Sequence, residues 1–166
     1  MNTIFREKRY LTPYIAWLNV LGNDGARIGE FMRKVAQLPT DAQTVLKSFS
    51  TAEFIEDQVA THFNLDDQQV NHLTLAIKDL LVGRLQSENF VPSFQSSLNI
   101  HPETSQQIAT MLYGGLLSSV FPNIKNLQLE KFPEKTNNST QNKPHSKRIP
   151  GINKNNIVDL RNPNNL

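Results

Sequence analysis

The chain has 166 residues, a length typical of one domain. Hydrophobic residues make up 38% of it, less than a fully globular chain usually contains, so we expect part of the chain not to fold. There is no cysteine, which excludes disulfides, thiolate zinc sites and cysteine nucleophiles and fits a reducing compartment.

A membrane span and a signal peptide are not expected. The longest apolar run, residues 108–121, has 14 residues, and about 18 to 20 are needed to cross a bilayer. The first ten residues are polar and charged, without the apolar core or the small-residue cleavage site of a signal peptide. We therefore expect a soluble, cytoplasmic protein.

Charge is distributed unevenly along the chain. Residues 128–166 hold seven Lys or Arg against three acids, a balance of +4, whereas residues 1–127 hold ten bases against twelve acids, a balance of −2. The basic character of the whole chain, net +2, therefore comes from its C-terminal part.

Helix signals recur along the chain, and strand signals are weak. Thr12 followed by Pro13 predicts a helix start, Ser50 with Glu53 forms a capping box, and Asp66 predicts another N-cap. The expected helices cover about residues 13–21, 26–38, 40–49, 50–63, 66–85, 87–98 and 102–122. The last one is expected to end before or near Pro122, since proline commonly stops a helix.

A shift of 35 residues aligns two segments of the chain. The aligned pairs are Ile55 with Phe90, Val59 with Phe94, Phe63 with Leu98, Asn64 with Asn99, Leu65 with Ile100, Leu73 with Ile108, Ile77 with Leu112, and Leu81 with Leu116. Each unit reads as a helix, a tight turn of Asn and a hydrophobic residue, and a longer helix. A duplication explains this, and so does a chance match of two amphipathic hairpins. Either way we expect stacked hairpins at 51–83 and 87–121.

The tail, residues 128–166, is expected to be disordered. It contains nine Asn and four Pro and few large apolar residues, so it cannot bury enough surface to offset the entropy of ordering. The predicted organisation is a helical domain over residues 1–127 followed by a basic, Asn- and Pro-rich tail.

The spacing of Ala60, Asn64, Leu65 and Val70 matches a DNA-binding helix-turn-helix. However, the helix that would enter the groove begins with two aspartates at 66 and 67, which DNA phosphates would repel. The pattern therefore favours a plain helical hairpin.

Two tail segments are candidate binding sites. Lys143, Lys147 and Arg148 form its densest basic stretch and could hold nucleic acid, although no aromatic residue interleaves them to stack on bases. An apolar cluster near the end reads as a short linear motif for a protein partner, as a strap onto the protein's own helices, or as a chance cluster. Its residues are Ile157, Val158, Asp159, Leu160 and Arg161.

Gly114 and Gly115 lie inside the most apolar expected helix, where glycine costs about 1 kcal/mol relative to alanine. A close backbone approach is expected to offset that cost. The approach is either an intramolecular helix crossing or a surface for self-association.

Catalytic and metal-binding patterns do not stand out in the sequence. The four histidines lack a metal-ligand spacing, and no phosphate-binding loop, dinucleotide-binding motif or nucleophile elbow is present. We therefore predict a non-enzymatic protein without a cofactor, a metal or a catalytic residue.

Several pieces of the two hairpins carry a family resemblance: Asp67-Gln68, Leu80 to Gly83, Phe90, Ile108-Ala109 and Val120 to Ile124. Over about 70 residues they resemble a helical module in uncharacterised proteins of small-genome candidate-phyla bacteria. The ending Asn156 to Arg161 is similar to the termini of such proteins, whereas Gly114 to Leu116 are less polar than the module. The resemblance implies a helical fold and a bacterial, cytoplasmic origin. It implies nothing about activity, because the module has no established one.

Together these patterns predict an all-α protein: an irregular bundle of about seven helices with two stacked hairpins and a C-terminal tail. The expected function is a non-catalytic protein-protein interaction module, an adaptor or scaffold, that uses the tail motif. The alternatives are a nucleic-acid-associated protein that uses the basic tail, and a structural homo-oligomer.

Overall fold

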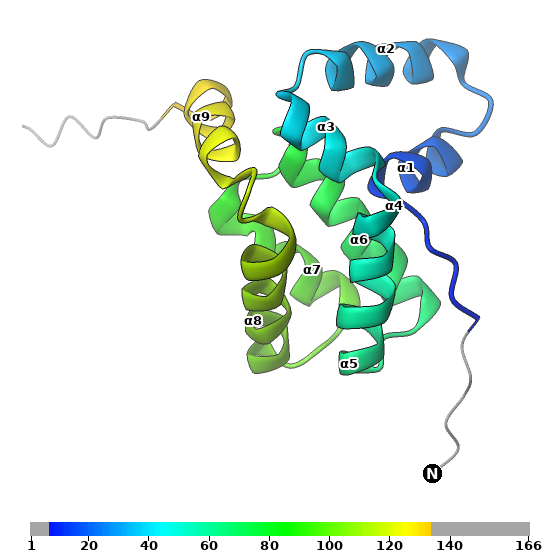
Figure 1. The fold of residues 1–166 in the computed structure, drawn as a ribbon, viewed down its shortest axis with the longest axis vertical. Helices are drawn as coiled ribbons and strands as arrows, with labels where there is room; N and C mark the ends of the chain where they lie inside the picture. Colours follow the sequence, from blue (N-terminus) through cyan, green and yellow to red (C-terminus); the bar gives the residue numbers. More distant parts are fainter. Residues whose placement is uncertain (1–6, 134–166) are drawn as a thin grey trace, which may run out of the picture. The chain divides into compact units, whose positions relative to one another are not determined.

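The computed structural model describes residues 7–133, and this part of the chain is helical without a strand (Figure 1). The α-helices are α1 (Pro13–Leu21), α2 (Gly25–Ala36), α3 (Thr40–Lys47), α4 (Phe49–Glu53), α5 (Thr61–Phe63), α6 (Asp67–Leu81), α7 (Phe90–Leu98), α8 (Pro102–Met111) and α9 (Phe121–Lys131). Two π-helical segments, η1 (Phe54–Ala60) and η3 (Leu112–Leu117), and a 3₁₀ turn, η2 (Ser87–Asn89), complete the helical elements. The all-α prediction is confirmed for these residues.

Residues 7–133 contain eight separate helices when the π-helical segments are joined to their neighbours, because α4, η1 and α5 continue without a break and η3 continues α8. This is one more than expected, and the additional helix is α9. The sequence reading took Pro122 as a stop, but Pro122 lies in the first turn of α9, where its missing N–H breaks no helical hydrogen bond.

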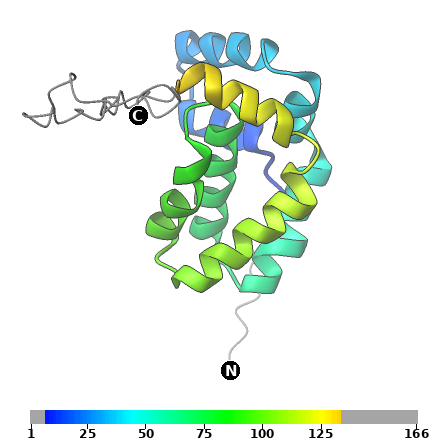
Figure 2. The same ribbon diagram turned by 90° about the vertical axis from the view of Figure 1, so that its left-hand side faces the viewer.

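Helix α9 continues past Gln128, so residues 128–131, which we expected in the tail, are helical. The Gln128 side chain ties this helix to the connection between α6 and α7. Its Nε2 donates to the Leu85 carbonyl at 2.8 Å, and its Oε1 accepts from the Ser87 N–H at 3.2 Å. Figure 2 shows α8 and α9 on one face of the described part.

Helix α6 is the centre of the described part, packed against α1, α3 and α7. Leu73, Ile77, Leu80 and Leu81 have no exposed surface, and each such side chain contributes about 1.5–3 kcal/mol on burial. Asp66 and Asp67 lie at the N-terminal end of this helix, where their carboxylates would repel DNA phosphates. The interpretation of residues 60–70 as a plain hairpin is consistent with this placement.

The two Asn turns have the same backbone conformation. Asn64 has φ 50° and Asn99 has φ 51°, both in the left-handed region that asparagine tolerates better than most residues. After the first turn, Asp66 and Gln69 form a capping box on α6, and Gln69 Nε2 also donates to the Leu98 carbonyl at 2.8 Å. That bond joins the N-terminal end of α6 to the C-terminal end of α7, so these two helices run antiparallel.

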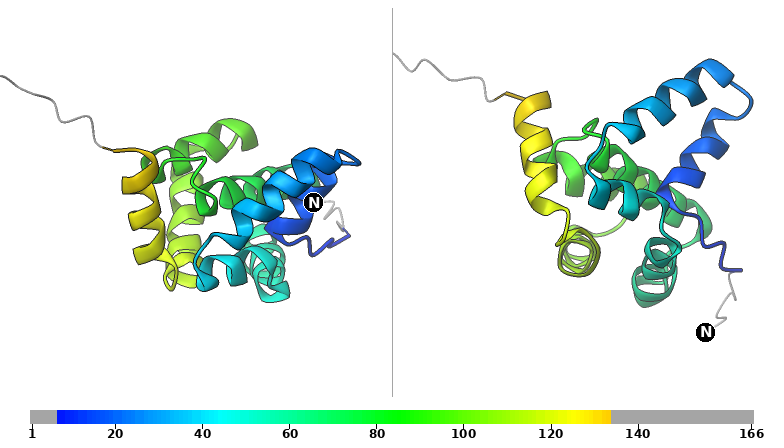
Figure 3. Two further views of the ribbon diagram at one scale, coloured as in Figure 1. Left: turned by 90° about the horizontal axis from the view of Figure 1, so that it is seen from above. Right: turned by 45° about the horizontal axis from the view of Figure 1, so that its top comes forward.

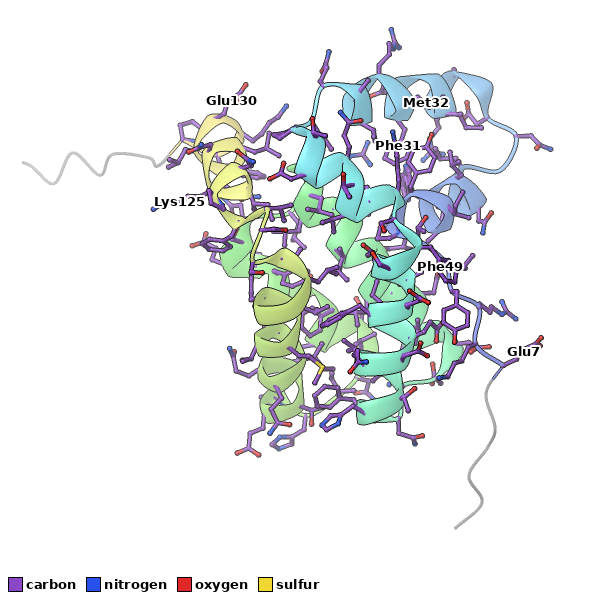
Figure 4. The ribbon with its side chains drawn as sticks, viewed as in Figure 1. Glu7, Phe31, Met32, Phe49, Lys125 and Glu130 are labelled. Atoms are coloured by element: carbon purple, nitrogen blue, oxygen red, sulfur yellow. The ribbon has the colours of Figure 1, made fainter. Side chains whose placement is uncertain are left out.

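Helices α1 and α2 form a hairpin at the edge of the described part (Figure 3). Phe31 of α2 points toward α1 and stacks on Tyr14 with ring centroids 5.4 Å apart, whereas Met32 points outward (Figure 4). Trp17 contacts the Phe31 ring from α1 and also faces α6, so the indole links the hairpin to the centre of the fold.

Candidate functional site

A groove of about 470 Å³ lies between α6, α7 and the segment that connects them. Its lining residues are His72, Leu75, Ala76, Asp79, Arg84, Leu85, Ser93, Phe94 and Ser97. On α6, positions 72, 76 and 79 share one face because they are spaced four and three residues apart, and on α7 positions 93 and 97 do the same. The volume lies in the range of small-ligand and peptide pockets.

The polar groups of the groove keep hydrogen-bonding capacity that the fold does not use. Ser93 Oγ donates to the Phe90 carbonyl at 2.7 Å and Ser97 Oγ donates to the Ser93 carbonyl at 2.9 Å, which leaves both oxygens as acceptors. His72 Nδ1 is buried and has no hydrogen-bond partner among the described residues. That nitrogen has no exposed surface, so the fold covers it and only the serine oxygens are open to a ligand in the groove.

Two cations and one carboxylate gather around Trp17 at one end of the groove. Lys78 Nζ lies 3.5 Å from the centre of the indole ring, and Arg84 Cζ lies 5.6 Å from it. Lys78 Nζ also donates to Asp79 Oδ1 at 2.5 Å. The Lys78 side chain is 1% exposed, so the α1–α6 interface holds a buried ammonium group on an aromatic face.

Arg84 differs from Lys78 in its exposure and its pairing. It is exposed and forms no ion pair within residues 7–133. Burial lowers the pKa of Lys78, the Asp79 carboxylate opposes that effect, and the nearby charge of Arg84 lowers the pKa further. The charge of Arg84 also lowers the pKa of Glu30, which is itself paired with Lys34.

A second, mostly apolar depression of about 610 Å³ lies where η3 meets α9, and Tyr113 and Phe121 form its walls. Their rings meet edge to face with centroids 5.8 Å apart, and Phe121 is 44% exposed. Burial raises the pKa of the Tyr113 hydroxyl above its ordinary value. Ser87 and Glu88 complete the rim.

Acidic residues of η1 hold the N-terminal segment. Asp57 accepts from Lys8 Nζ at 2.7 Å and from the Tyr10 hydroxyl at 3.1 Å, and the Arg9 N–H donates to Glu56 Oε1 at 3.3 Å. The hydrogen bond from Lys8 lowers the pKa of Asp57. These contacts fix residues 8–10 against the helix that carries the first hairpin.

One residue of the predicted glycine pair, Gly115, lies against a side chain of another helix. A Cβ on Gly115 would overlap the ring of Phe54, so the two π-helical segments η1 and η3 approach each other there. A Cβ on Gly114 would meet no atom within 4 Å. The intramolecular alternative explains Gly115, whereas self-association through Gly114 stays a prediction.

The other predicted site residues lie outside the described part of the chain. This applies to the basic residues Lys143, Lys147 and Arg148 and to the apolar motif at residues 157–161. Among residues 7–133, no group of three or more His, Asp or Glu side chains is placed to hold a metal ion. No helix in that range is long and apolar enough to cross a membrane.

Sequence reasoning missed the α6–α7 groove. In the sequence, His72 stands out only as a possible metal ligand, and no pattern marks Ser93 or Ser97. The available signal was the polar face at positions 72 and 79 of an otherwise buried helix. Its meaning depends on α7, whose serines lie about 20 residues further along the chain.

Comparisons with known proteins give no match. No protein-family model, no curated protein and no solved structure matches this chain.

Proposed function

We propose that this protein is a non-catalytic protein-protein interaction module, an adaptor or scaffold, that binds a segment of its partner in the α6–α7 groove. The observation that carries the proposal is the groove itself: apolar walls from two packed helices, combined with two serine oxygens that keep acceptor capacity and an exposed Arg84 side chain without an ion pair among the described residues. Such a mixture of apolar surface and a few unused polar groups is typical of binding sites.

The arrangement of the serines supports binding rather than nucleophilic chemistry. A nucleophilic serine needs a base that accepts its proton. Here both groove serines donate to backbone carbonyls of their own helix, Ser93 to Phe90 and Ser97 to Ser93. They are therefore positioned as hydrogen-bond acceptors for a bound chain.

The tail adds a second contact in this proposal. The motif at residues 157–161 would engage the same partner, so that two weak contacts on one chain raise the overall affinity. The proposal places the protein in the cytoplasm, with the two hairpins, 51–83 and 87–121, as the rigid support of the groove.

Affinity capture with a matched pair of variants tests the proposal. Ser97 and Ser96 are adjacent, exposed residues of α7, and only Ser97 lines the groove. Ser97→Trp would fill the groove, and Ser96→Trp adds the same ring outside it. We expect nuclease-treated lysate to yield a protein partner whose capture falls at least about tenfold with Ser97→Trp and is unchanged with Ser96→Trp.

Two results would argue against this function. Equal capture by both variants would mean that the groove is not the binding surface. A partner that disappears on nuclease treatment would favour the alternative, in which the basic tail associates with nucleic acid.

A further inference from the structure

The charge at the Arg84 end of the groove selects the chemistry of the occupant. Lys78 and Arg84 both contact the Trp17 ring, and Asp79 is hydrogen-bonded to Lys78. Arg84 forms no ion pair among the described residues, and Glu30, a carboxylate whose pKa its charge lowers, is already paired with Lys34. An exposed guanidinium group held on an aromatic face offers paired N–H donors that fit a carboxylate.

The groove is bounded at this same end. The connection from α6 to α7 turns at Gly83, where φ is +68°, and α9 covers it through Leu127 and Gln128. A chain that runs along the groove toward Arg84 therefore meets the connection. A partner chain that ends at the connection would bring its terminal carboxylate beside Arg84, whereas a chain that continues has to turn away from the groove.

The length and lining of the groove fit a short extended segment. From His72 to Asp79 is seven residues of α6, or about 10 Å at 1.5 Å per residue, the length of about three extended residues. Leu75, Ala76 and Phe94 supply apolar surface along that length. The serine oxygens of α7 can accept hydrogen bonds from backbone N–H groups of the bound segment.

We infer that the groove binds the C-terminal end of a partner polypeptide, with the terminal carboxylate at Arg84 and the last apolar residues along α6 and α7. This inference rests on the proposed function and specifies its partner. The proposed ligand is a peptide terminus. A free aliphatic acid has the same carboxylate and apolar chain, and the test distinguishes it from a peptide.

Peptide titration of the full chain tests the inference. The probes are N-acetyl-Ala-Leu-Ala-Leu as the free acid, the same peptide as its carboxamide, the same peptide extended by Gly-Gly, and octanoate. Trp17 is the only tryptophan of the chain and lies beside Arg84, so its fluorescence reports binding at that end. Backbone amide shifts of Ser93 and Ser97 report the rest of the groove.

We expect the free acid to bind at least about tenfold more tightly than the carboxamide, the factor given by one charge-assisted hydrogen bond. The extended peptide should also bind at least about tenfold more weakly, because its carboxylate cannot reach Arg84. Arg84→Gln should reduce the affinity for the free acid to that for the carboxamide. Arg33→Gln, an exposed change on α2 away from the groove, should leave the affinity unchanged.

Three results would overturn the inference: equal affinity for acid and carboxamide, octanoate binding as tightly as the peptide, or no saturable shift at millimolar peptide. Each leaves the proposed function separately testable. Suppose that Ser97→Trp abolishes partner capture but the acid and the carboxamide bind equally well. The groove would then remain an interaction surface, and recognition of a terminal carboxylate would be rejected.

Discussion

At the scale of single residues, Lys78 is the most unusual group in the described part of the chain. Its ammonium group is buried, lies on the face of Trp17 and has one carboxylate partner, Asp79. A buried ion pair contributes little net stability, because the loss of hydration offsets the attraction between the charges. The contact with the aromatic ring contributes about 0.5–2 kcal/mol.

Lys78→Met removes one partner of the pair, but Asp79 is 35% exposed and stays hydrated, so the variant should lie within about 2 kcal/mol of wild-type stability at neutral pH. The pKa of Lys78 is lowered in the folded state from its ordinary value of 10.5. At a pH between the lowered pKa and 10.5, Lys78 is protonated in the unfolded chain but not in the folded chain. Wild-type stability should therefore rise with pH in that window relative to the variant. Urea unfolding at neutral pH and at about pH 9.5 measures both effects.

A loss of more than about 2 kcal/mol at neutral pH would contradict this prediction. It would show that the ammonium group, through Trp17 and Asp79, stabilises the α1–α6 interface more than its desolvation costs.

The glycine pair provides an internal control for close packing. Gly115→Ala should destabilise the fold by about 1–3 kcal/mol because its methyl group overlaps the Phe54 ring. Gly114→Ala has open space and should stabilise the helix by up to about 1 kcal/mol. Thermal unfolding of the two variants compares them directly, and equal effects would contradict the assigned contact.

At the scale of helices, capping residues predicted where many elements begin. Thr12 caps α1, with Ile15 N–H donating to its Oγ1 at 3.2 Å, and Asp66 caps α6 as expected. The expected capping box at Ser50 is absent: Ser48 caps α4 instead, and Ser50 lies inside that helix. Ser48 and Ser50 are both suitable N-cap residues, and the local sequence alone does not show which of them caps the helix.

Elements that depend on tertiary contacts could not be predicted. Helix α9 is weakly amphipathic, and its contacts include Ile124 in the core, Leu127 on Gly83 and Gln128 on the 85–87 segment. The two π-helical segments have no sequence signature and meet at Phe54 and Gly115. The groove was missed for the same reason, since it exists only where α6 and α7 pack together.

The left-handed turns give an element-scale prediction. Asn64→Ala and Asn99→Ala should each destabilise the protein by about 1–2 kcal/mol, because alanine tolerates a positive φ poorly. The glycine variants at the same two positions should remain within about 0.5 kcal/mol of the wild type. Urea unfolding of the four variants provides the measurement, and a glycine variant as damaged as its alanine counterpart would mean that the asparagine side chain itself is required.

At the scale of the whole molecule, the described helices and the tail have different expected roles. The buried residues form one cluster that extends from Leu21 on α1 to Ile124 on α9. The tail was predicted from composition to contribute no core, and its residues 134–166 lie outside the described residues. We therefore treat the helical part as the stable support and the tail as an accessory contact.

Removal of residues 134–166 should leave the thermal midpoint within about 2 °C of that of the full chain, because no core residue of the helices is lost. The same truncation should weaken partner capture without abolishing it, since the groove remains. A drop of several degrees, measured by circular dichroism, would show that the tail stabilises the helices.

The central claim is that a partner segment lies in the α6–α7 groove. A photo-cross-linking amino acid at Ser97 in the full chain tests it most directly, with the same amino acid at Ser96 as the control. The account predicts that the Ser97 position forms a cross-link to one protein in nuclease-treated lysate, near that protein's C-terminus, and that the Ser96 position does not. Cross-links of equal yield and pattern from both positions, or none from Ser97, would contradict it.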